Sequence, residues 1–148
     1  MDIIIEEFNN TKHNYYEYCF LLKELTSINP DKISQQDFMN HMSKIQSNPY
    51  HKIFVASINN KIIGSITILI EPKIIHDLSY VSHIEDVVVS TQYRGQGIGL
   101  RLMNKAIEVS QEYGCYKIIL DCAISRIDFY NKCGFVVYET QMVKRLDK

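Results

Sequence analysis

The residues best placed for chemistry lie in one stretch, where two carboxylates, a short apolar run and a glycine-rich turn follow one another. Glu85 and Asp86 stand directly before Val87–Val89, which reads as a buried strand. Residues 94–99 then form a glycine-rich turn that opens an amphipathic helix. Backbone N–H groups at such a helix start are unpaired, and the helix dipole favours an anion. The stretch therefore predicts a phosphate cradle with two carboxylates at the adjoining strand end.

The composition excludes several classes of function. The chain has 148 residues, 46% apolar and 22% charged, as expected for one globular domain over residues 1–148. A net charge of −1 gives no basic field for nucleic acid or a membrane surface. The longest apolar segment, 62–70, is interrupted by polar residues and is too short to span a bilayer. The acidic start lacks the basic flank of a signal peptide, so we expect a cytoplasmic protein.

No metal site is predicted. The four cysteines show no metal-ligand spacing, and we expect free thiols in a reducing compartment, each packed as a small buried side chain. These cysteines are Cys19, Cys115, Cys122 and Cys133. The histidines outside the 71–77 segment also lack metal spacing; they are His13, His41, His51 and His83.

Hydrophobic periodicity predicts the element order β α α β β β α β α β. Helices are expected over 12–25, 34–45, 98–113 and 124–132, and strands over 3–5, 52–58, 62–70, 78–89, 116–122 and 135–144. Ser34 and Asp37 match a helix cap, Asn59 and Asn60 a hairpin turn, and Gly114 a helix stop. An antiparallel half followed by a β-α-β unit indicates an α/β (α+β) fold, with one mixed central sheet and helices on both faces.

The spacing of the glycine turn separates its alternatives. A P-loop would need a Lys followed by Ser or Thr after the glycines, and a dinucleotide fold would need G-x-G-x-x-G rather than the G-x-G-x-G found here. A turn that binds nothing is a further alternative, although one left-handed residue would suffice for it. The remaining pattern is that of the GCN5-related N-acetyltransferases, which this turn resembles. The resemblance implies their fold and an acetyl-CoA pyrophosphate loop made of Arg94, Gly95, Gln96, Gly97, Ile98 and Gly99.

Four further segments are similar to the glucosamine 6-phosphate N-acetyltransferase family. They are residues 72–78, 83–87, 113–122 and 129–135, in the family's order. The resemblance implies transfer of acetyl from acetyl-CoA to the 2-amino group of glucosamine 6-phosphate, directly and within a ternary complex. The product would feed UDP-N-acetylglucosamine synthesis. No metal is implied.

The resemblance and the strand positions together suggest roles for the catalytic residues. Tyr130 is implied as the acid facing the CoA sulfur, and the backbone N–H of Val87, freed by a bulge, as the donor to the thioester oxygen. Glu85 and Asp121 lie at neighbouring strand ends and could hold and deprotonate the amine. A core tyrosine and solvated strand-end acids are the alternatives. Asp86 alternates away from Glu85 and is expected to face outward or to be structural. The resemblance nevertheless implies that residues 85–87 all lie beside the cofactor.

A sugar phosphate requires cations, and the resemblance suggests which ones. It implies a substrate-binding set in addition to Glu85 and Asp121, namely Thr26, Lys73, Ile74, Ile75, His76, Lys117 and Arg145. The family's intertwined homodimer implies that Arg145 reaches the neighbouring site. Surface lysines and arginines are also common without any such role.

One segment departs from the family pattern, because Arg126 stands where an asparagine is expected. Arg126 could pair with a CoA phosphate or face solvent. Cys122 is not expected to act as a nucleophile, because burial in a strand would keep its thiol inert. The alternative functions are acetylation of another amine, such as a polyamine, an aminoglycoside or a protein N-terminus, and acyl-CoA sensing without turnover.

Overall fold

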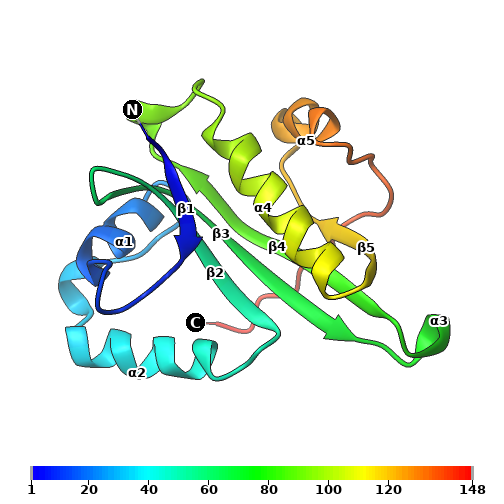
Figure 1. Cartoon of the computed structure of the whole chain (residues 1–148), viewed down its shortest axis with the longest axis horizontal. Coiled ribbons are helices and arrows are strands. Elements are labelled where there is room, and N and C mark those ends of the chain that lie inside the picture. Colours follow the sequence, from blue (N-terminus) through cyan, green and yellow to red (C-terminus); the bar gives the residue numbers. More distant parts are fainter. Residues whose placement is uncertain (1, 148) are drawn as a thin grey trace.

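The computed structural model describes residues 2–147 (Figure 1). Its elements follow the predicted order as far as the last helix, with one added short helix between the third and fourth strands. The strands are β1 (Ile4–Glu7), β2 (His51–Ile58), β3 (Lys61–Pro72), β4 (Tyr80–Val89) and β5 (Cys115–Leu120). The helices are α1 (Tyr15–Leu22), α2 (Gln35–Gln46), α3 (Ile75–Leu78), α4 (Ile98–Glu112) and α5 (Ile127–Lys132). Short 3-10 helices occupy Pro30–Lys32, Thr91–Tyr93 and Ile124–Arg126.

The strands form one mixed sheet in the order β1-β2-β3-β4-β5. The first four are antiparallel, and β5 runs parallel to β4 after the α4 crossover. The β2–β3 hairpin turns at Asn59 and Asn60, whose φ values of 49° and 66° are left-handed. Two successive left-handed residues are what a tight hairpin with right-handed strand twist requires.

Helices cover both faces of the sheet, as predicted (Figure 1). On one face α4 packs its apolar side, including the fully buried Leu102, Met103 and Ala106, against β2, β3 and β4. On the other face α1 and α2 supply Tyr18, Leu21 and Met42 to a second core. The Ser34 hydroxyl caps α2 as predicted, accepting a hydrogen bond from the Asp37 N–H at 3.0 Å. The ends of β4 and β5 contribute residues to the cavity described below.

Within the single chain, the segment predicted as the last strand, 135–144, forms no strand. β5 is the last strand of the sheet, and the segment after α5 pairs with no strand among the described residues. Its apolar side chains are exposed, with Val136 at 82% and Met142 at 91%. A strand needs a neighbouring edge for its backbone groups. This segment meets β5 through side chains, with Tyr138 beside Lys117 and Gln141 bonded to Asp121, and not through a backbone ladder.

The predicted burial of the cysteines is largely wrong, and β5 is partly exposed. Tyr116 and Ile119 on β5 are exposed, at 42% and 38%, and no residue of β5 is fully buried. All four thiols are free, as expected, but only Cys19 is buried, and Cys122 is exposed. The burial argument against reactivity of Cys122 therefore fails. Within residues 2–147 no helix is long and apolar enough to cross a membrane.

Candidate functional site

A β-bulge lies at the centre of the site. In the β3–β4 ladder Ser65 pairs with Val88 and Thr67 pairs with Glu85, so Asp86 and Val87 together oppose the single residue between them on β3. Asp86 adopts a left-handed backbone with φ of 50°. A bulge of this kind interrupts the ladder and redirects side chains. The strand irregularity that the resemblance implied at Val87 is therefore present.

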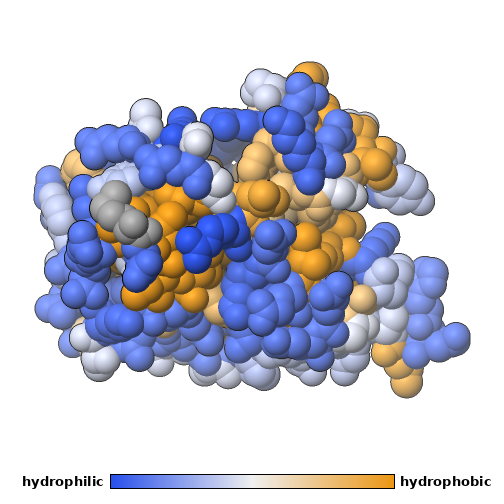
Figure 2. Space-filling view, turned by 45° about the horizontal axis from the view of Figure 1, so that its top comes forward, coloured by the Kyte–Doolittle hydropathy of each residue, from blue (hydrophilic) through white to orange (hydrophobic). Residues whose placement is uncertain are grey.

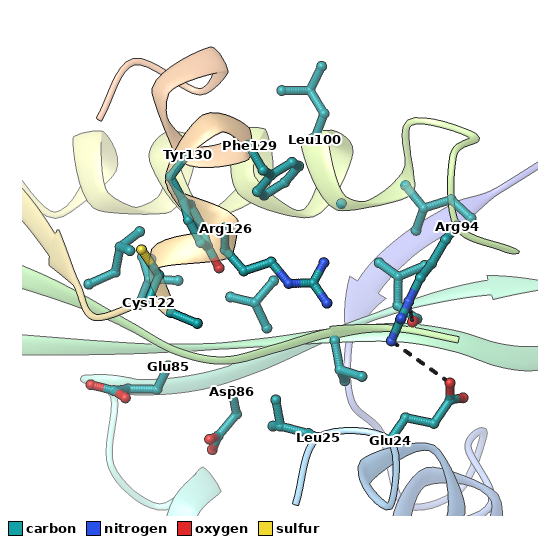
Figure 3. Close-up of a pocket in the computed structure, with 18 of the residues that line it drawn as sticks. Glu24, Leu25, Glu85, Asp86, Arg94, Leu100, Cys122, Arg126, Phe129 and Tyr130 are labelled. Carbon is teal, nitrogen blue, oxygen red and sulfur yellow. Dashed lines mark hydrogen bonds and ion pairs between the residues drawn. The ribbon is translucent and has the colours of Figure 1, made fainter. Parts of the chain in front are cut away.

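The bulge also changes where Asp86 points. Strict alternation predicts that Asp86 faces away from Glu85, but both side chains line the same cavity, and Figure 3 shows them on the same side of the strand. Asp86 is exposed, as predicted, but it does not alternate away from Glu85, because the extra residue breaks the two-residue period.

Glu85 and Asp121 meet where two parallel strands separate. The β4–β5 pairing ends at Ile84 and Leu120, and the two acids are the next residues on each strand. Burial raises the pKa of Glu85, and the negative charges of Asp86 and then Asp121 raise it further. A carboxylate with a raised pKa is suited to accept a proton from an amine, and neighbouring negative charges favour a bound ammonium.

The glycine turn prepares a helix start for an anion. Gly95 and Gly97 both have φ of 79°, a conformation that side chains disfavour. Gly97 is the residue before α4, and no side chain caps this helix. The first N–H groups of the 15-residue helix therefore lack a side-chain acceptor, and the cavity lies against them.

Arg94 is held by two contacts at this turn. Its Nε donates to the Val89 carbonyl at 3.0 Å, and a terminal nitrogen lies 3.9 Å from the Glu24 carboxylate (Figure 3). Glu24 also accepts hydrogen bonds from the Thr91 hydroxyl and from the Thr91 N–H, the latter at 2.8 Å. The segment after α1 is thus tied to the turn, and part of the Arg94 charge is offset by Glu24.

The third glycine serves packing rather than backbone conformation. A Cβ at Gly99 would lie 3.1 Å from the Phe129 ring, so the absence of a side chain lets α5 approach the start of α4. This approach places Tyr130, the neighbour of Phe129, over the cavity with its hydroxyl pointing inward (Figure 3). Burial raises the pKa of Tyr130, and the Cys122 and Cys133 thiols add to the rise, whereas the Arg126 charge opposes it. The phenol is therefore protonated at neutral pH and able to donate.

One cavity of about 880 Å³ joins these features. All residues predicted to bind the cofactor line it, except Gln96, which lies in the turn without facing the cavity. Its lining includes all four predicted catalytic residues, Glu85, Val87, Asp121 and Tyr130. The predicted cofactor-binding residues and the predicted catalytic residues therefore line the same cavity. Among residues 2–147 no group of three or more potential metal ligands is found.

Most residues predicted to bind the sugar phosphate lie outside this cavity. Lys73 pairs with Glu71 at 3.2 Å, and the His76 ring packs against the Tyr116 ring at a tilt, with ring centroids 4.4 Å apart. Ile74 and Ile75 are exposed at the projecting tip that carries α3, at the lower right of Figure 2. Their roles stay predictions, as do those of three other exposed residues: Thr26 next to the cavity-lining Leu25, Lys117 over the Tyr116 and Tyr138 rings, and Arg145 in the last segment.

Several cavity residues were not predicted. Glu24, Leu25 and Phe129 line it, and so does Gln141, whose amide donates to the Asp121 carboxylate at 3.0 Å. Glu24 lies far from the turn in the sequence, so no local spacing indicates it. The position of Phe129 could have been suspected from Gly99. A third glycine, beyond those that the turn needs, can indicate that another element packs closely against the backbone.

The chain matches the model of the acetyltransferase (GNAT) family over residues 8–135. It therefore belongs to this family, as its fold, uncapped helix start and paired strand-end acids indicate.

Similar proteins with named activities indicate which members of the GNAT family this chain resembles. The chain is 35% identical to the glucosamine 6-phosphate N-acetyltransferase of Candida albicans over 132 residues, which are 87% of each chain. It is 36% identical to glucosamine 6-phosphate N-acetyltransferase 1 of Dictyostelium discoideum, over 84% of this chain and 80% of that one. The crystal structure of glucosamine-6-phosphate N-acetyltransferase from Arabidopsis thaliana superposes with a TM-score of 0.93 at 29% identity, covering 99% of this chain and 100% of that one. The predicted resemblance to the GNAT family and the predicted resemblance to the glucosamine 6-phosphate N-acetyltransferases are both confirmed.

Proposed function

We propose that this chain transfers the acetyl group of acetyl-CoA to the 2-amino group of D-glucosamine 6-phosphate, giving N-acetyl-D-glucosamine 6-phosphate and CoA. The observation that carries the proposal is the placement of Glu85 and Asp121 in the same cavity as the uncapped start of α4. The named activity of the relatives supplies the acceptor.

The reaction is a direct transfer within a ternary complex. Glu85, directly or through a water, accepts a proton from the bound ammonium, and Asp121 holds that group at the strand separation. The neutral amine attacks the thioester carbon while the Val87 N–H donates to the carbonyl oxygen. The C–N bond forms, the C–S bond breaks, and Tyr130 gives its proton to the departing sulfur. The nitrogen loses its second proton as the amide forms, and this proton passes to solvent or restores the Tyr130 phenol. The start of α4 and Arg94 bind the diphosphate of the co-substrate.

The proposal includes a homodimer in which Arg145 reaches the neighbouring site. Exposed apolar side chains in the last segment, such as Val137 at 72% and Leu146 at 89%, favour a partner surface. A single chain also leaves Lys73 and His76 outside its own cavity. A second copy would cover the last segment and bring cations to an acceptor end that is otherwise acidic.

We further propose a cytoplasmic protein whose product enters UDP-N-acetylglucosamine synthesis. Four free thiols are typical of a reducing compartment, and the pathway follows from the named activity of the relatives.

The acceptor is tested by measuring CoA thiol release with glucosamine 6-phosphate, glucosamine, spermidine and an aminoglycoside. The phosphorylated sugar should have the highest kcat/KM, and equal values for the two sugars would contradict a phosphate site.

Tyr130→Phe should lower kcat roughly 10- to 10³-fold, the usual scale for general acid catalysis, with little change in CoA affinity. A loss of CoA affinity in its place would contradict the assigned role.

The shared site is tested with two variants mixed in one solution. Arg145→Ala should mainly raise KM for the sugar phosphate, because one charge-assisted contact is lost. If Arg145 acts in the neighbouring site, mixed Tyr130→Phe and Arg145→Ala chains should recover activity that neither has alone. Light scattering on the wild type measures the oligomeric state. A monomer, or no recovery after exchange, would count against the dimer.

A further inference from the structure

The cavity contains a second arginine that forms no ion pair with any of residues 2–147. Arg126 directly precedes α5, is exposed, and lines the cavity together with Arg94. Arg94 is bonded to Val89 and lies beside Glu24, whereas none of the ion pairs within residues 2–147 includes Arg126. An unpaired guanidinium with its donors free is a strong binder of phosphate oxygens.

The backbone around Arg126 holds it in a defined place. Its N–H donates to the Ala123 carbonyl at 2.8 Å, which closes the short 3-10 turn before α5. One turn further on, Phe129 lies against Gly99 at the start of α4. The wall that carries Arg126 is therefore packed directly onto the helix whose N-terminus borders the glycine turn. This packing keeps the two sides of the cavity at a set separation.

The direction of the side chain indicates which anion it meets. In Figure 3 the guanidinium extends toward Arg94 and away from Glu85 and Asp86. The acids at the strand separation line the acceptor end, and an arginine serving that end would be expected to pair with one of them. Arg126 points to the end where the glycine turn and Arg94 lie. At that end a negative group would be bounded by cations on both sides.

We propose that Arg126 binds the diphosphate of CoA from the wall opposite the glycine turn, so that the diphosphate is held between Arg94 and Arg126. This inference rests on the proposed use of acetyl-CoA. It adds a cofactor-binding residue on the cavity wall next to α5. It also gives the segment before α5 a function: it links the cofactor's diphosphate to the helix that carries Tyr130.

Three competitors of acetyl-CoA test the assignment: CoA, dephospho-CoA, which keeps the diphosphate, and pantetheine, which has neither phosphate group. Arg126→Gln removes the charge at similar size. It should weaken CoA and dephospho-CoA equally, about 10- to 100-fold on the scale of one or two charge-assisted hydrogen bonds. Pantetheine binding should be unchanged. Lys132→Gln is the matched control, because it removes the same charge from an exposed position on α5 outside the cavity.

Each outcome decides the inference. Equal weakening of all three ligands by Arg126→Gln would indicate a general loss of the site and overturn it. Weakening of CoA alone would assign Arg126 to the 3′-phosphate and also overturn it. Equal weakening of CoA binding by Arg126→Gln and Lys132→Gln would mean that only the overall charge matters, and would also overturn the inference. Arg126→Lys, which keeps the charge, should retain most of the affinity. Tight CoA binding by a wild type that does not acetylate glucosamine 6-phosphate would refute the proposed acceptor and leave this inference standing.

Discussion

Replacing Gly99 by alanine should move Tyr130 without unfolding the protein. The new methyl carbon would lie 3.1 Å from Cζ and 3.3 Å from Cε1 of Phe129, and carbon atoms ordinarily approach to about 3.5–4.0 Å. The ring must therefore retreat by about half an ångström. Phe129 is part of the six-residue α5, so the displacement passes to the adjoining Tyr130.

The expected cost differs between stability and catalysis. Overpacking typically costs about 1–3 kcal/mol, and the higher helix propensity of alanine returns about 1 kcal/mol, because Gly99 has an ordinary helical backbone. The net loss of unfolding free energy should be about 0–2 kcal/mol. A catalytic group misplaced by about 1 Å can cost about 100-fold in rate. Half that displacement at Tyr130 should lower kcat about tenfold.

A double-mutant cycle with Phe129→Leu measures this coupling. Urea unfolding and steady-state kinetics are recorded for Gly99→Ala, Phe129→Leu and the double variant, which should regain part of the kcat lost in Gly99→Ala. Gly95→Ala is the control: its methyl group would meet nothing within 4 Å, but its φ of 79° makes alanine cost about 1–2 kcal/mol of stability with no displacement of α5. A Gly99→Ala enzyme with wild-type kcat, or a cycle without coupling, would refute the reasoning.

Two further predictions concern carboxylates. Asp86→Asn, which tolerates the left-handed backbone, should lower the raised pKa of Glu85 and shift the acid limb of the kcat/KM profile to lower pH. Asp128→Asn, outside the cavity, should leave the limb in place, and an upward shift in the Asp86 variant would contradict Glu85 as the base. The Thr91 hydrogen bonds lower the pKa of Glu24 below its ordinary 4.5. Its stabilisation is therefore complete above pH 4.5 and lost as pH falls through the lower folded-state pKa. Glu24→Gln should flatten that part of the pH dependence of thermal unfolding, and an unchanged curve would exclude the Glu24 contribution.

Elements with strong local signals were predictable from the sequence. Apolar residues recur at helical spacing over 98–113, and α4 spans Ile98–Glu112 with Gly114 just beyond it in a left-handed conformation. The cap at Ser34 and the turn at Asn59 are equally local, since each depends on one side chain and its own backbone. The resemblance then located the site, because the glycine turn and the strand-end acids lie close together in the sequence or on paired strands.

The remaining features depend on contacts that no local pattern records. The bulge at Asp86 breaks the alternation on which the outward-facing prediction relied, and nothing in the apolar pattern of β4 indicates it. Exposure of Cys122, two residues beyond the end of β5, depends on which distant segments lie near it, and the described residues leave it exposed. The Glu24–Thr91 contact joins residues 67 positions apart. In each case the deciding neighbour is distant in the sequence.

The three glycines lead to a different conclusion from the one that their number suggests. An excess of glycine suggests a ligand, but Gly95 and Gly97 are required by left-handed backbone and Gly99 by the contact with Phe129. Glycine content alone is therefore explained by folding. The stronger indication of an anion is the uncapped start of α4 facing a cavity that also contains an unpaired Arg126. Because the Gly99 contact sets where α5 lies, the same packing that builds the phosphate end also positions the acid that would protonate the leaving thiolate.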